Sequence, residues 1–358
     1  MSKTALIMAG GTGGHIFPGL AVAHALRDTG WRVHWLGGRG SAERPSMESQ
    51  LVPKEGFAFE AIDFGGLRGK GLATAVLLPL RLLQAFWQSI AVIRRVRPDV
   101  VVGLGGYISF PAGMMGVLLG KPLILHEQNS VAGLANRVLA GVADRVFTAF
   151  PNVIKDARWV GNPLRNAFLT VPEPQARFAG RSGPLQVLVV GGSLGAKALN
   201  EIVPQALALL PSDQRPQVVH QSGASQIDAL HANYAQAGVS ARLTPFIDNT
   251  AQAFADADLI ICRAGASTVT EIAAVGAAAL FVPFPAAVDD HQTSNARFLV
   301  DQGAGWLIQQ RDLRPQVVAD LLLNLKRPAL LDKALQAKKL QKNDATQQLV
   351  AACEELTT

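Results

Sequence analysis

Two glycine-rich turns are the parts of this chain best suited to chemistry. The apolar run at 5–9 leads into Gly10-Gly11-Thr12-Gly13-Gly14-His15, and the run at 187–190 leads into Gly191-Gly192-Ser193-Leu194-Gly195. An apolar-periodic segment follows each turn, so both patterns indicate a buried strand, a glycine turn and a helix. This unit aims free backbone N–H groups at a phosphate. The repetition predicts two similar α/β domains that face a shared cleft and can each hold a phosphorylated ligand.

The first turn is neither a dinucleotide fingerprint nor a Walker loop. Ile16 stands where G-x-G-x-x-G requires its third glycine, and no acidic residue ends the next strand near Leu36. His15 lies at the mouth of the turn, where a loop residue bonded to the backbone is the simpler interpretation. Because imidazole titrates near neutral pH, this histidine is also well placed to take a proton from an incoming hydroxyl.

The second turn matches the G-x-S-x-G nucleophile elbow, and Asp258 and His291 follow Ser193 in hydrolase order. A serine hydrolase is nevertheless the weaker interpretation, because the first half has the same architecture without a serine at its turn. A hydrolase also needs no homologous domain upstream. We expect Ser193 to present its hydroxyl and its N–H to a phosphate at the start of a helix.

The carboxylate of Glu271 is a third candidate group. Thr268-Val269-Thr270-Glu271 fits a capping box, in which Glu271 would only bond back to the N–H of Thr268. Gly265-Ala266 precedes this segment and a phosphate-type turn lies upstream, which favours another role. A carboxylate offers two acceptor oxygens in one plane and therefore suits the vicinal hydroxyls of a ribose. The combined pattern predicts nucleoside binding.

Neither a metal nor a cofactor is predicted. Asp289-Asp290-His291-Gln292 has residues of the ligand type, but adjacent carboxylates point apart on most backbones and a third hard ligand is missing. Backbone N–H groups, helix dipoles and Arg165 can balance the charge of a diphosphate instead.

Alternating strands and helices must position these groups. Strands that are apolar throughout are buried on both faces and predict parallel sheets. We expect a helix from Pro18 to about Arg27, with Pro18 at its first position and Gly30 as its stop. A polar, mobile stretch is expected at 37–48. The remaining expected elements are strands at 4–9, 33–36, 99–102, 122–126, 187–190, 258–261 and 279–282, helices at about 111–119 and from about Val269, and a helical tail at about 316–355.

The chain is expected to form two domains, because 358 residues exceed the usual size of a single core. The apolar pattern lapses near Gly161-Asn162-Pro163, and a stretch rich in Pro, Arg and Gly follows. We therefore predict an α/β fold of two Rossmann-like domains, at 1–163 and 164–341, with parallel sheets that face a central cleft. A C-terminal helix at 342–358 is expected to pack on the first domain.

Composition and charge favour anionic partners. Charged residues make up 17% of the chain against a typical ~25%, and apolar residues make up 49%. The net charge of +6 and the pI of about 9.5 favour phosphates or an acidic membrane. Nucleic acid is not expected as a partner, because no stripe of Lys and Arg interleaved with aromatics is present. Two distant cysteines, Cys262 and Cys353, and a start without a secretory signal are typical of a cytoplasmic protein.

The segment at 72–97 combines apolar and basic side chains. Its leucines, Phe86 and Trp87 lead into Arg94, Arg95 and Arg97, and no apolar run reaches the ~18 residues that a membrane-spanning helix needs. One interpretation is a crossover helix with a buried apolar stripe. The second is a helix on an anionic membrane surface, where each Lys or Arg contributes ~1 kcal/mol. Both hold if they concern opposite faces of the helix.

Taken together, these motifs resemble one enzyme family. The matching residues occur in order at 10–18, 65–71, 105–107, 126–129, 161–165, 191–193, 246–248, 263–266 and 292–295. They are similar to the bacterial N-acetylglucosaminyltransferases that complete the lipid-linked peptidoglycan precursor, the MurG family. The resemblance implies an inverting transferase with the GT-B fold. It would move N-acetylglucosamine from UDP-N-acetylglucosamine to the muramyl 4-hydroxyl of undecaprenyl-diphospho-muramoyl pentapeptide, as a peripheral protein at the cytoplasmic face of the inner membrane.

The same resemblance implies roles for individual positions. Domain 1–163 would serve the acceptor and the membrane, and domain 164–341 would bind the UDP-sugar. Glu271 would hold the ribose, the Ile247 backbone the uracil, and Ser193 and Arg165 the diphosphate. His15 would be the general base or orient the acceptor. The implied donor contacts are Thr12, Gly13, Gly14, Asn129, Arg165, Ser193, Ile247, Ala266, Ser267, Thr268, Val269, Thr270, Glu271 and Gln292.

The chain departs from the family pattern at two places. His291 stands where some members have a glutamine, and 286–290 differs in length, so sugar contacts near them are in question. Ser267 stands where leucine is common, which puts its side-chain contact in question.

Three rival functions are compatible with parts of the pattern. A UDP-N-acetylglucosamine 2-epimerase would share the two-domain plan without a lipid acceptor. A non-catalytic membrane adaptor would bind nucleotide sugars without turnover. The serine hydrolase would use Ser193 as its nucleophile.

Overall fold

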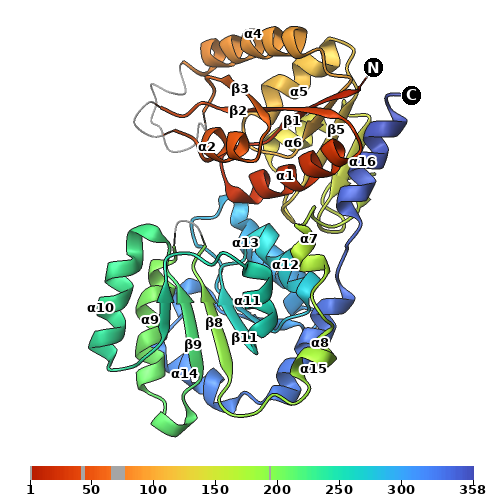
Figure 1. The fold of residues 1–358 in the computed structure, drawn as a ribbon. Coiled ribbons are helices and arrows are strands. Elements are labelled where there is room, and N and C mark those ends of the chain that lie inside the picture. Colours follow the sequence, from red (N-terminus) through yellow and green to blue (C-terminus); the bar gives the residue numbers. More distant parts are fainter. Residues whose placement is uncertain (1, 42–44, 66–76, 193–194) are drawn as a thin grey trace. The chain divides into compact units, whose positions relative to one another are not determined.

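Each half of the chain builds its own parallel β-sheet (Figure 1). The structure is a computed structural model that describes residues 2–41, 45–65, 77–192 and 195–358. The chain divides into two compact units, one formed by 1–165 with 343–358 and the other by 166–342.

Strands and helices alternate along both units. The first unit contains β1 (Thr4–Met8), α1 (Gly13–Asp28), β2 (Arg32–Gly38), α2 (Met47–Lys54), β3 (Ala58–Ile62), α4 (Leu78–Val96), β4 (Val100–Gly103), α5 (Ser109–Leu118), β5 (Leu123–Glu127), α6 (Leu134–Leu139), β6 (Arg145–Thr148), β7 (Arg158–Trp159) and α16 (Ala345–Glu355). The second contains α7 (Asn166–Leu169), α8 (Pro174–Phe178), β8 (Gln186–Val190), α9 (Lys197–Ala208), β9 (Gln217–Gln221), α10 (Ile227–Ala237), β10 (Arg242–Thr244), α11 (Thr250–Asp256), β11 (Leu259–Cys262), α12 (Ala266–Val275), β12 (Ala279–Phe281), α13 (His291–Val300), β13 (Gly305–Leu307), α14 (Pro315–Asn324) and α15 (Arg327–Lys339).

The two sheets repeat one strand order. The first runs β3-β2-β1-β4-β5-β6-β7 and the second β10-β9-β8-β11-β12-β13, with parallel neighbours throughout. The predicted duplication and the parallel α/β fold are therefore confirmed. The chain changes direction along the sheet between β1 and β4 and between β8 and β11. Ligands of open parallel sheets bind at such switch points, outside the carboxyl ends of the strands, and both glycine turns follow there.

Helices cover both faces of the first sheet. The first face packs under α1 and α16, with Val22 and Leu349 among the buried contacts. The opposite face packs under α4, α5 and α6, with Ala85, Ala112 and Leu139 in the cluster. The C-terminal helix α16 is thus part of the core of the first unit.

Helix α1 begins earlier than the sequence predicted. It starts at Gly13 rather than Pro18, because Thr12 is extended (φ −138°, ψ 158°) and its carbonyl accepts the N–H of His15 at 3.0 Å. Pro18 lies inside the helix, so its predicted place at the first position is wrong. Gly30 follows the helix with a left-handed φ of +88°, as the predicted stop requires. His15 consequently lies in the first turn of a helix and not in a loop.

Helix α12 also begins earlier than predicted, and this removes the capping box. Its first residue is Ala266, and Gly265 is the N-cap with extended backbone (φ −63°, ψ 146°). Thr268 is the third residue of the helix, so the capping box, which was the alternative role for Glu271, does not form at this helix start. The Glu271 carboxylate is not needed to close the helix end.

The stretch at 37–48, which was predicted to be mobile, ends in a buried carboxylate. Gly37 and Gly38 close β2, and Glu48 lies in α2 with its side chain fully buried. Its Oε1 accepts the N–H of Gly38 at 3.1 Å and its Oε2 accepts the N–H of Gly11 at 3.3 Å. The prediction is wrong at both ends of the stretch, because Glu48 ties the end of β2 to the first glycine turn.

Helix α4 has two faces of different character. Ala85, Val92 and Ile93 are buried against the sheet, whereas Leu80 and Trp87 are 66% and 64% exposed. The buried crossover helix and the exposed apolar face that the sequence suggested therefore coexist in this segment, of which 72–76 lies outside the described residues. None of the helices in the described ranges has the length and hydropathy to cross a bilayer.

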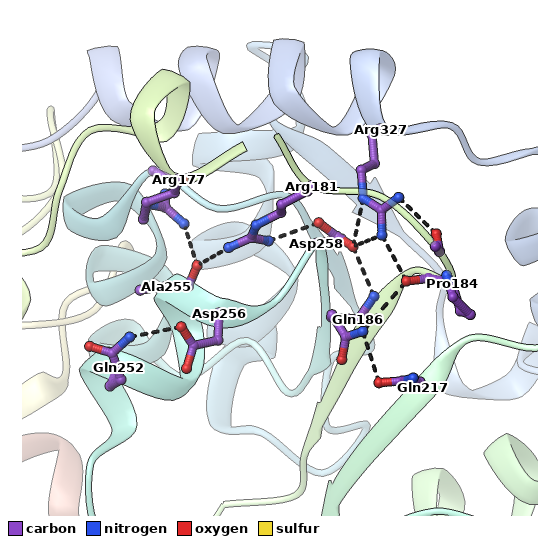
Figure 2. A network of polar contacts seen from close by, with 12 residues as sticks. Arg177, Arg181, Pro184, Gln186, Gln217, Gln252, Ala255, Asp256, Asp258 and Arg327 are labelled. Carbon is purple, nitrogen blue, oxygen red and sulfur yellow. Dashed lines mark hydrogen bonds and ion pairs between the residues drawn. The ribbon is translucent and has the colours of Figure 1, made fainter. Parts of the chain in front are cut away.

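A buried ion-pair network holds the amino ends of the second sheet (Figure 2). Oδ1 of Asp258 accepts from Arg181 at 2.8 Å, and Oδ2 accepts from Arg327 at 3.1 Å and from the N–H of Gln186 at 2.8 Å. The Asp258 side chain is fully buried. The network joins the segment before β8 and helix α15 to the start of β11.

Candidate active site

In the first unit, the predicted phosphate-binding groups lie at the amino end of α1. Thr12 is the exposed N-cap, and Gly13, Gly14 and His15 form the first turn. The N–H groups of a first helical turn have no partner inside the helix and carry the positive end of its dipole. This end of α1 can therefore bind an anion.

The His15 ring is held by residues at the end of β5. Its Nδ1 lies 2.8 Å from Oε1 of Gln128, and Nε2 of Gln128 lies 3.1 Å from Nδ1 of His126. Both partners are buried. Burial lowers the pKa of His126 to about 4, so this ring is neutral at physiological pH. The sequence gives no signal for this role of Gln128, because its pairing with His15 joins residues far apart in the chain.

Asn129 is positioned by the carboxylate of Glu127. Oε1 of Glu127 accepts the backbone N–H of Asn129 at 2.9 Å, and Oε2 accepts from the side chain of Asn136 at 2.8 Å. Because Glu127 is buried, its oxygens serve the loop between β5 and α6 and not a ligand.

Arg165 brings a positive charge to the same helix. Its guanidinium lies over the ring of Phe17 in α1, 5.4 Å from the ring centroid. Both side chains are exposed. The structure thus places Arg165 near the first turns of α1, where it can add to the anion-binding capacity of that helix end.

In the second unit, the buried side-chain amide of Gln221 joins the glycine turn after β8 to the loop after β10. Gln221 accepts the N–H of Gly192 with Oε1 at 3.1 Å, and its Nε2 donates to the carbonyls of Gly192 at 3.1 Å and Pro245 at 2.9 Å. Gln221 therefore fixes the distance between the turn after β8 and the loop after β10. Ser193 and Leu194 lie outside the described residues. The sequence offered no signal for Gln221 beyond its place at the end of a strand.

Ile247 lies in the loop that Gln221 holds. This loop follows β10, and the Ile247 carbonyl accepts from the hydroxyl of Thr250 at 3.4 Å. Within the described residues, the N–H of Ile247 has no hydrogen-bond acceptor. A free N–H beside a half-buried side chain at this edge of the sheet is the group that the sequence analysis assigned to a uracil.

The first turns of α12 carry the predicted run from Ala266 to Glu271. Val269 is buried, and the hydroxyl of Thr270 donates back to the Ala266 carbonyl at 3.0 Å, so these two side chains serve the helix. Ser267 and Thr268 add N–H groups at the helix start. Glu271 is half-buried in the second turn. Burial raises the pKa of the Cys262 thiol, and the nearby charge of Glu271 adds a smaller rise to it.

Gln292 has only half of its side-chain amide available. Its Oε1 accepts the N–H groups of Ala264 at 3.2 Å and Phe284 at 2.9 Å. In addition, the side chain of Asn295 donates to the Ala264 carbonyl at 3.1 Å. Two amides of α13 thus hold the peptide that precedes α12, and only the NH₂ group of Gln292 is left to donate to a ligand.

The position of Asp258 excludes it from a hydrolase triad with Ser193. Asp258 precedes β11 at the amino end of the sheet, where Arg181 and Arg327 bind it (Figure 2). The turn at Gly191 follows β8 at the carboxyl end, and β8 and β11 pair in register from Val187 to Val190. A strand of this length separates the two ends by roughly 13–17 Å, which is too far for a relay.

Groups of at least three His, Cys, Asp or Glu side chains that could hold a metal ion do not occur among the described residues. In the segment 289–292, the hydroxyl of Thr293 donates to Asp290 at 2.7 Å, and both aspartates have a left-handed backbone. Burial raises the pKa of Cys262 well above its ordinary value. That cysteine is consequently a thiol inside the core and neither a nucleophile nor a metal ligand.

Known proteins and family models match this chain along nearly its full length. Two family models match it: the glycosyltransferase family 28 N-terminal domain at residues 5–148 and the C-terminal domain of the same family at 186–349. The crystal structure of MurG from Acinetobacter baumannii matches with a TM-score of 0.85 at 40% identity, over 99% of both chains. A glycosyltransferase of kitacinnamycin, 15% identical with a TM-score of 0.73 over 100% of both chains, shares the fold.

Two curated relatives carry the same name. The UDP-N-acetylglucosamine–N-acetylmuramyl-(pentapeptide) pyrophosphoryl-undecaprenol N-acetylglucosamine transferase of Polaromonas sp. (strain JS666) is 76% identical over 99% of this chain and 92% of its own. The protein of that name from Cupriavidus necator is 62% identical over 99% of this chain and 98% of its own.

Proposed function

Because the chain belongs to glycosyltransferase family 28, we propose that it moves N-acetylglucosamine from UDP-N-acetylglucosamine to the muramyl 4-hydroxyl of undecaprenyl-diphospho-N-acetylmuramoyl pentapeptide, with inversion. The observation that carries this proposal is the name shared by relatives that are 76% and 62% identical over 99% of the chain. The enzyme is a hexosyltransferase, and its product would be the lipid-linked disaccharide precursor of peptidoglycan.

The second unit would bind the UDP-sugar and the first would serve the acceptor and the membrane. Glu271 would accept hydrogen bonds from the ribose hydroxyls, and the N–H of Ile247 would donate to the uracil. Arg165 and Ser193 would hold the diphosphate. The remaining proposed donor contacts are Thr12, Gly13, Gly14, Asn129, Ala266, Ser267, Thr268 and Gln292. The free N–H groups at the starts of α1 and α12 support this assignment.

The reaction would be a single in-line displacement. The acceptor hydroxyl gives its proton to His15 while its oxygen attacks the anomeric carbon, and UDP leaves with the electron pair of the broken bond. Helix amino ends and Arg165 stabilise the charge that develops on the leaving diphosphate. Holding donor and acceptor in line supplies much of the remaining acceleration.

A transfer assay tests the proposal. Radiolabelled UDP-N-acetylglucosamine and the lipid-linked muramyl acceptor are expected to give a labelled lipid product, with the same yield in the presence of a chelator. Interconversion of the UDP-sugar without an acceptor would identify a 2-epimerase, and binding without turnover would identify an adaptor. Either result overturns the proposal.

Replacing Glu271 with alanine is expected to weaken UDP-N-acetylglucosamine binding by about 1.5–3 kcal/mol, the contribution of hydrogen bonds to a charged group. The dissociation constant, measured by calorimetry, then rises roughly 10- to 150-fold. Glu201→Ala, which removes a carboxylate paired with Lys197 on α9, is the control and leaves the affinity unchanged. An unchanged affinity together with a lower melting temperature for Glu271→Ala would assign the carboxylate a structural role.

We further propose that the exposed face of α4 docks on an anionic membrane, at the cytoplasmic face of the inner membrane. Leu80, Leu83 and Trp87 are 66%, 54% and 64% exposed on this helix, and Leu77 at its N-cap is 44% exposed. Arg94 in the last turn is exposed as well. Apolar side chains beside arginines are the combination that a reversible interfacial helix requires.

Changing Leu80, Leu83 and Trp87 together to serine is expected to lower binding to anionic vesicles at least ~10-fold, because each buried apolar side chain contributes roughly 1.5–3 kcal/mol when fully inserted. Co-sedimentation measures the loss. The matched control changes Leu209, Val317 and Leu323 of the second unit, which are 51%, 40% and 41% exposed, to serine. Equal binding by both triple variants would show that another surface is responsible.

A further inference from the structure

A directed chain of hydrogen bonds runs from His15 into the core of the first unit. Nδ1 of His15 lies 2.8 Å from Oε1 of Gln128, Nε2 of Gln128 lies 3.1 Å from Nδ1 of His126, and Nε2 of His126 lies 2.8 Å from the carbonyl of Gly161. The carbonyl at the inner end can only accept. Nε2 of His126 therefore carries a hydrogen, and Nδ1 of this neutral ring accepts.

Two separate contacts determine the orientation of the Gln128 side-chain amide. Its Nε2 faces Nδ1 of His126 and also the backbone carbonyl of His126, at 3.2 Å. Both groups are acceptors, so the NH₂ group must face them and Oε1 must face His15. An amide oxygen only accepts. The hydrogen of the bond between Gln128 and His15 consequently belongs to Nδ1 of His15.

The surrounding residues leave the side chains of His15 and Gln128 little freedom to move apart. His126 and Gln128 are 0% and 1% exposed. Gly105 has a left-handed φ of +86°, and a Cβ at this position would lie 2.7 Å from Nδ1 of His15 and 3.0 Å from Oε1 of Gln128. Glycine at 105 thus leaves the space in which the bond forms. Nε2 of His15, by contrast, has no hydrogen-bond partner among the described residues.

We propose that Gln128 is a positioning residue that locks neutral His15 as the Nδ1–H tautomer and so presents the lone pair of Nε2 to the acceptor hydroxyl. This inference rests on the proposed function, in which His15 is the base. The acceptor O–H bond breaks as the Nε2–H bond forms, and the oxygen's electron pair makes the bond to the anomeric carbon. The bond between that carbon and the UDP oxygen breaks, and its electron pair leaves with UDP.

The same bond serves both states of the ring. Nδ1–H donates to Oε1 before the proton transfer and continues to donate after it, so the imidazolium is formed without reorientation. Without Gln128, the hydrogen can move to Nε2, and a ring in that tautomer cannot take a proton there. Loss of the correct tautomer is a known way to lose base catalysis while the geometry is kept.

The tautomer can be measured directly on the full chain. Histidine-selective ¹⁵N labelling and NMR distinguish a protonated from an unprotonated ring nitrogen, and the His15→Gln spectrum assigns the signals of His15. In the neutral form of the ring, we expect Nδ1 to carry the hydrogen and Nε2 to be unprotonated. A hydrogen on Nε2 in the unsubstituted protein overturns the proposal. This readout needs neither acceptor nor turnover. It therefore tests the proposal even when a Gln128 variant does not fold.

Kinetics test whether Gln128 acts through His15. Gln128→Leu is expected to lower kcat roughly 10- to 100-fold, less than loss of the base itself, with UDP-N-acetylglucosamine affinity kept. In a His15→Ala background the same substitution is expected to have no further effect on kcat. The matched control is Gln50→Leu on α2, an exposed glutamine that bonds to the carbonyls of Pro45 and Ser46. A further fall in the His15→Ala background, or full activity of Gln128→Leu, overturns the positioning role.

The two proposals fail in different ways. If His15→Ala transfers at the full rate, the base assignment in the proposed function is wrong, and the NMR measurement still decides whether Gln128 sets the tautomer. If the NMR measurement shows the other tautomer while His15→Ala is inactive, the base stands and the lock is wrong.

Discussion

Replacing His15 with alanine is expected to lower kcat for N-acetylglucosamine transfer roughly 10²–10⁴-fold, the range for removal of a general base. The affinity for UDP-N-acetylglucosamine should stay nearly unchanged, because the anion-binding N–H groups at the start of α1 belong to the backbone and remain. Single-turnover rates with saturating donor, together with calorimetric donor binding, separate the two effects.

The control for this substitution is His24→Ala, also on α1. The ring of His24 bonds to Glu55 at 3.2 Å and to Arg27 at 2.7 Å, away from the glycine turn. We expect it to keep the full transfer rate. A His15→Ala variant that loses donor affinity more than kcat would show that His15 binds the donor and is not the base.

The repeated strand–turn–helix unit made most of the fold predictable. Runs such as 5–9 and 187–190 are apolar throughout, and a parallel strand buried on both faces requires that composition. Both runs became central strands at switch points, β1 and β8. Helix starts were predicted less well. Pro18 is a favoured first residue, but the extended backbone at Thr12 and the hydrogen bonds to its carbonyl started α1 earlier.

The candidate site was predictable only where its chemistry is local. Glycine turns and helix starts depend on neighbouring residues, so their N–H groups could be located from sequence. Gln128 and Gln221 act through partners far away in the sequence, His15 on α1 for the first and Gly192 and Pro245, after β8 and β10, for the second. Glutamine has no pattern of spacing that announces such pairings, because they are set by strand order and register. Glu48 was missed for the same reason.

The network around Asp258 gives the largest expected effect on stability. The fully buried carboxylate is bound by two arginines, each with 18% of its side chain exposed, and by the N–H of Gln186. Removing this carboxylate leaves both arginines without a counter-charge. Breaking a buried ion pair in this way costs roughly 3–5 kcal/mol. Asp258→Ala should lower the free energy of unfolding of the second unit by that amount. Asp258→Asn should cost nearly as much, because its NH₂ group would face an N–H donor in either orientation of the amide.

Hydrogen exchange of the amides in β8 and β11 measures this loss of stability within the second unit. A single melting temperature would not, because the chain has two units that can unfold separately. Asp256→Ala is the matched control, since the Asp256 side chain is exposed and bonds to Gln252 at 2.7 Å (Figure 2). The network lies at the amino ends of the strands, a strand length away from the turns that would bind the donor, so kcat per folded molecule should not change in either variant. Surface substitutions usually change stability by no more than about 0.5 kcal/mol. If the opening free energies from hydrogen exchange in Asp258→Ala and Asp256→Ala differ by no more than that, the arginines have found new acceptors. The carbonyls of Ala255 and Pro184, which already accept from Arg181 and Arg327, are the groups that would take over.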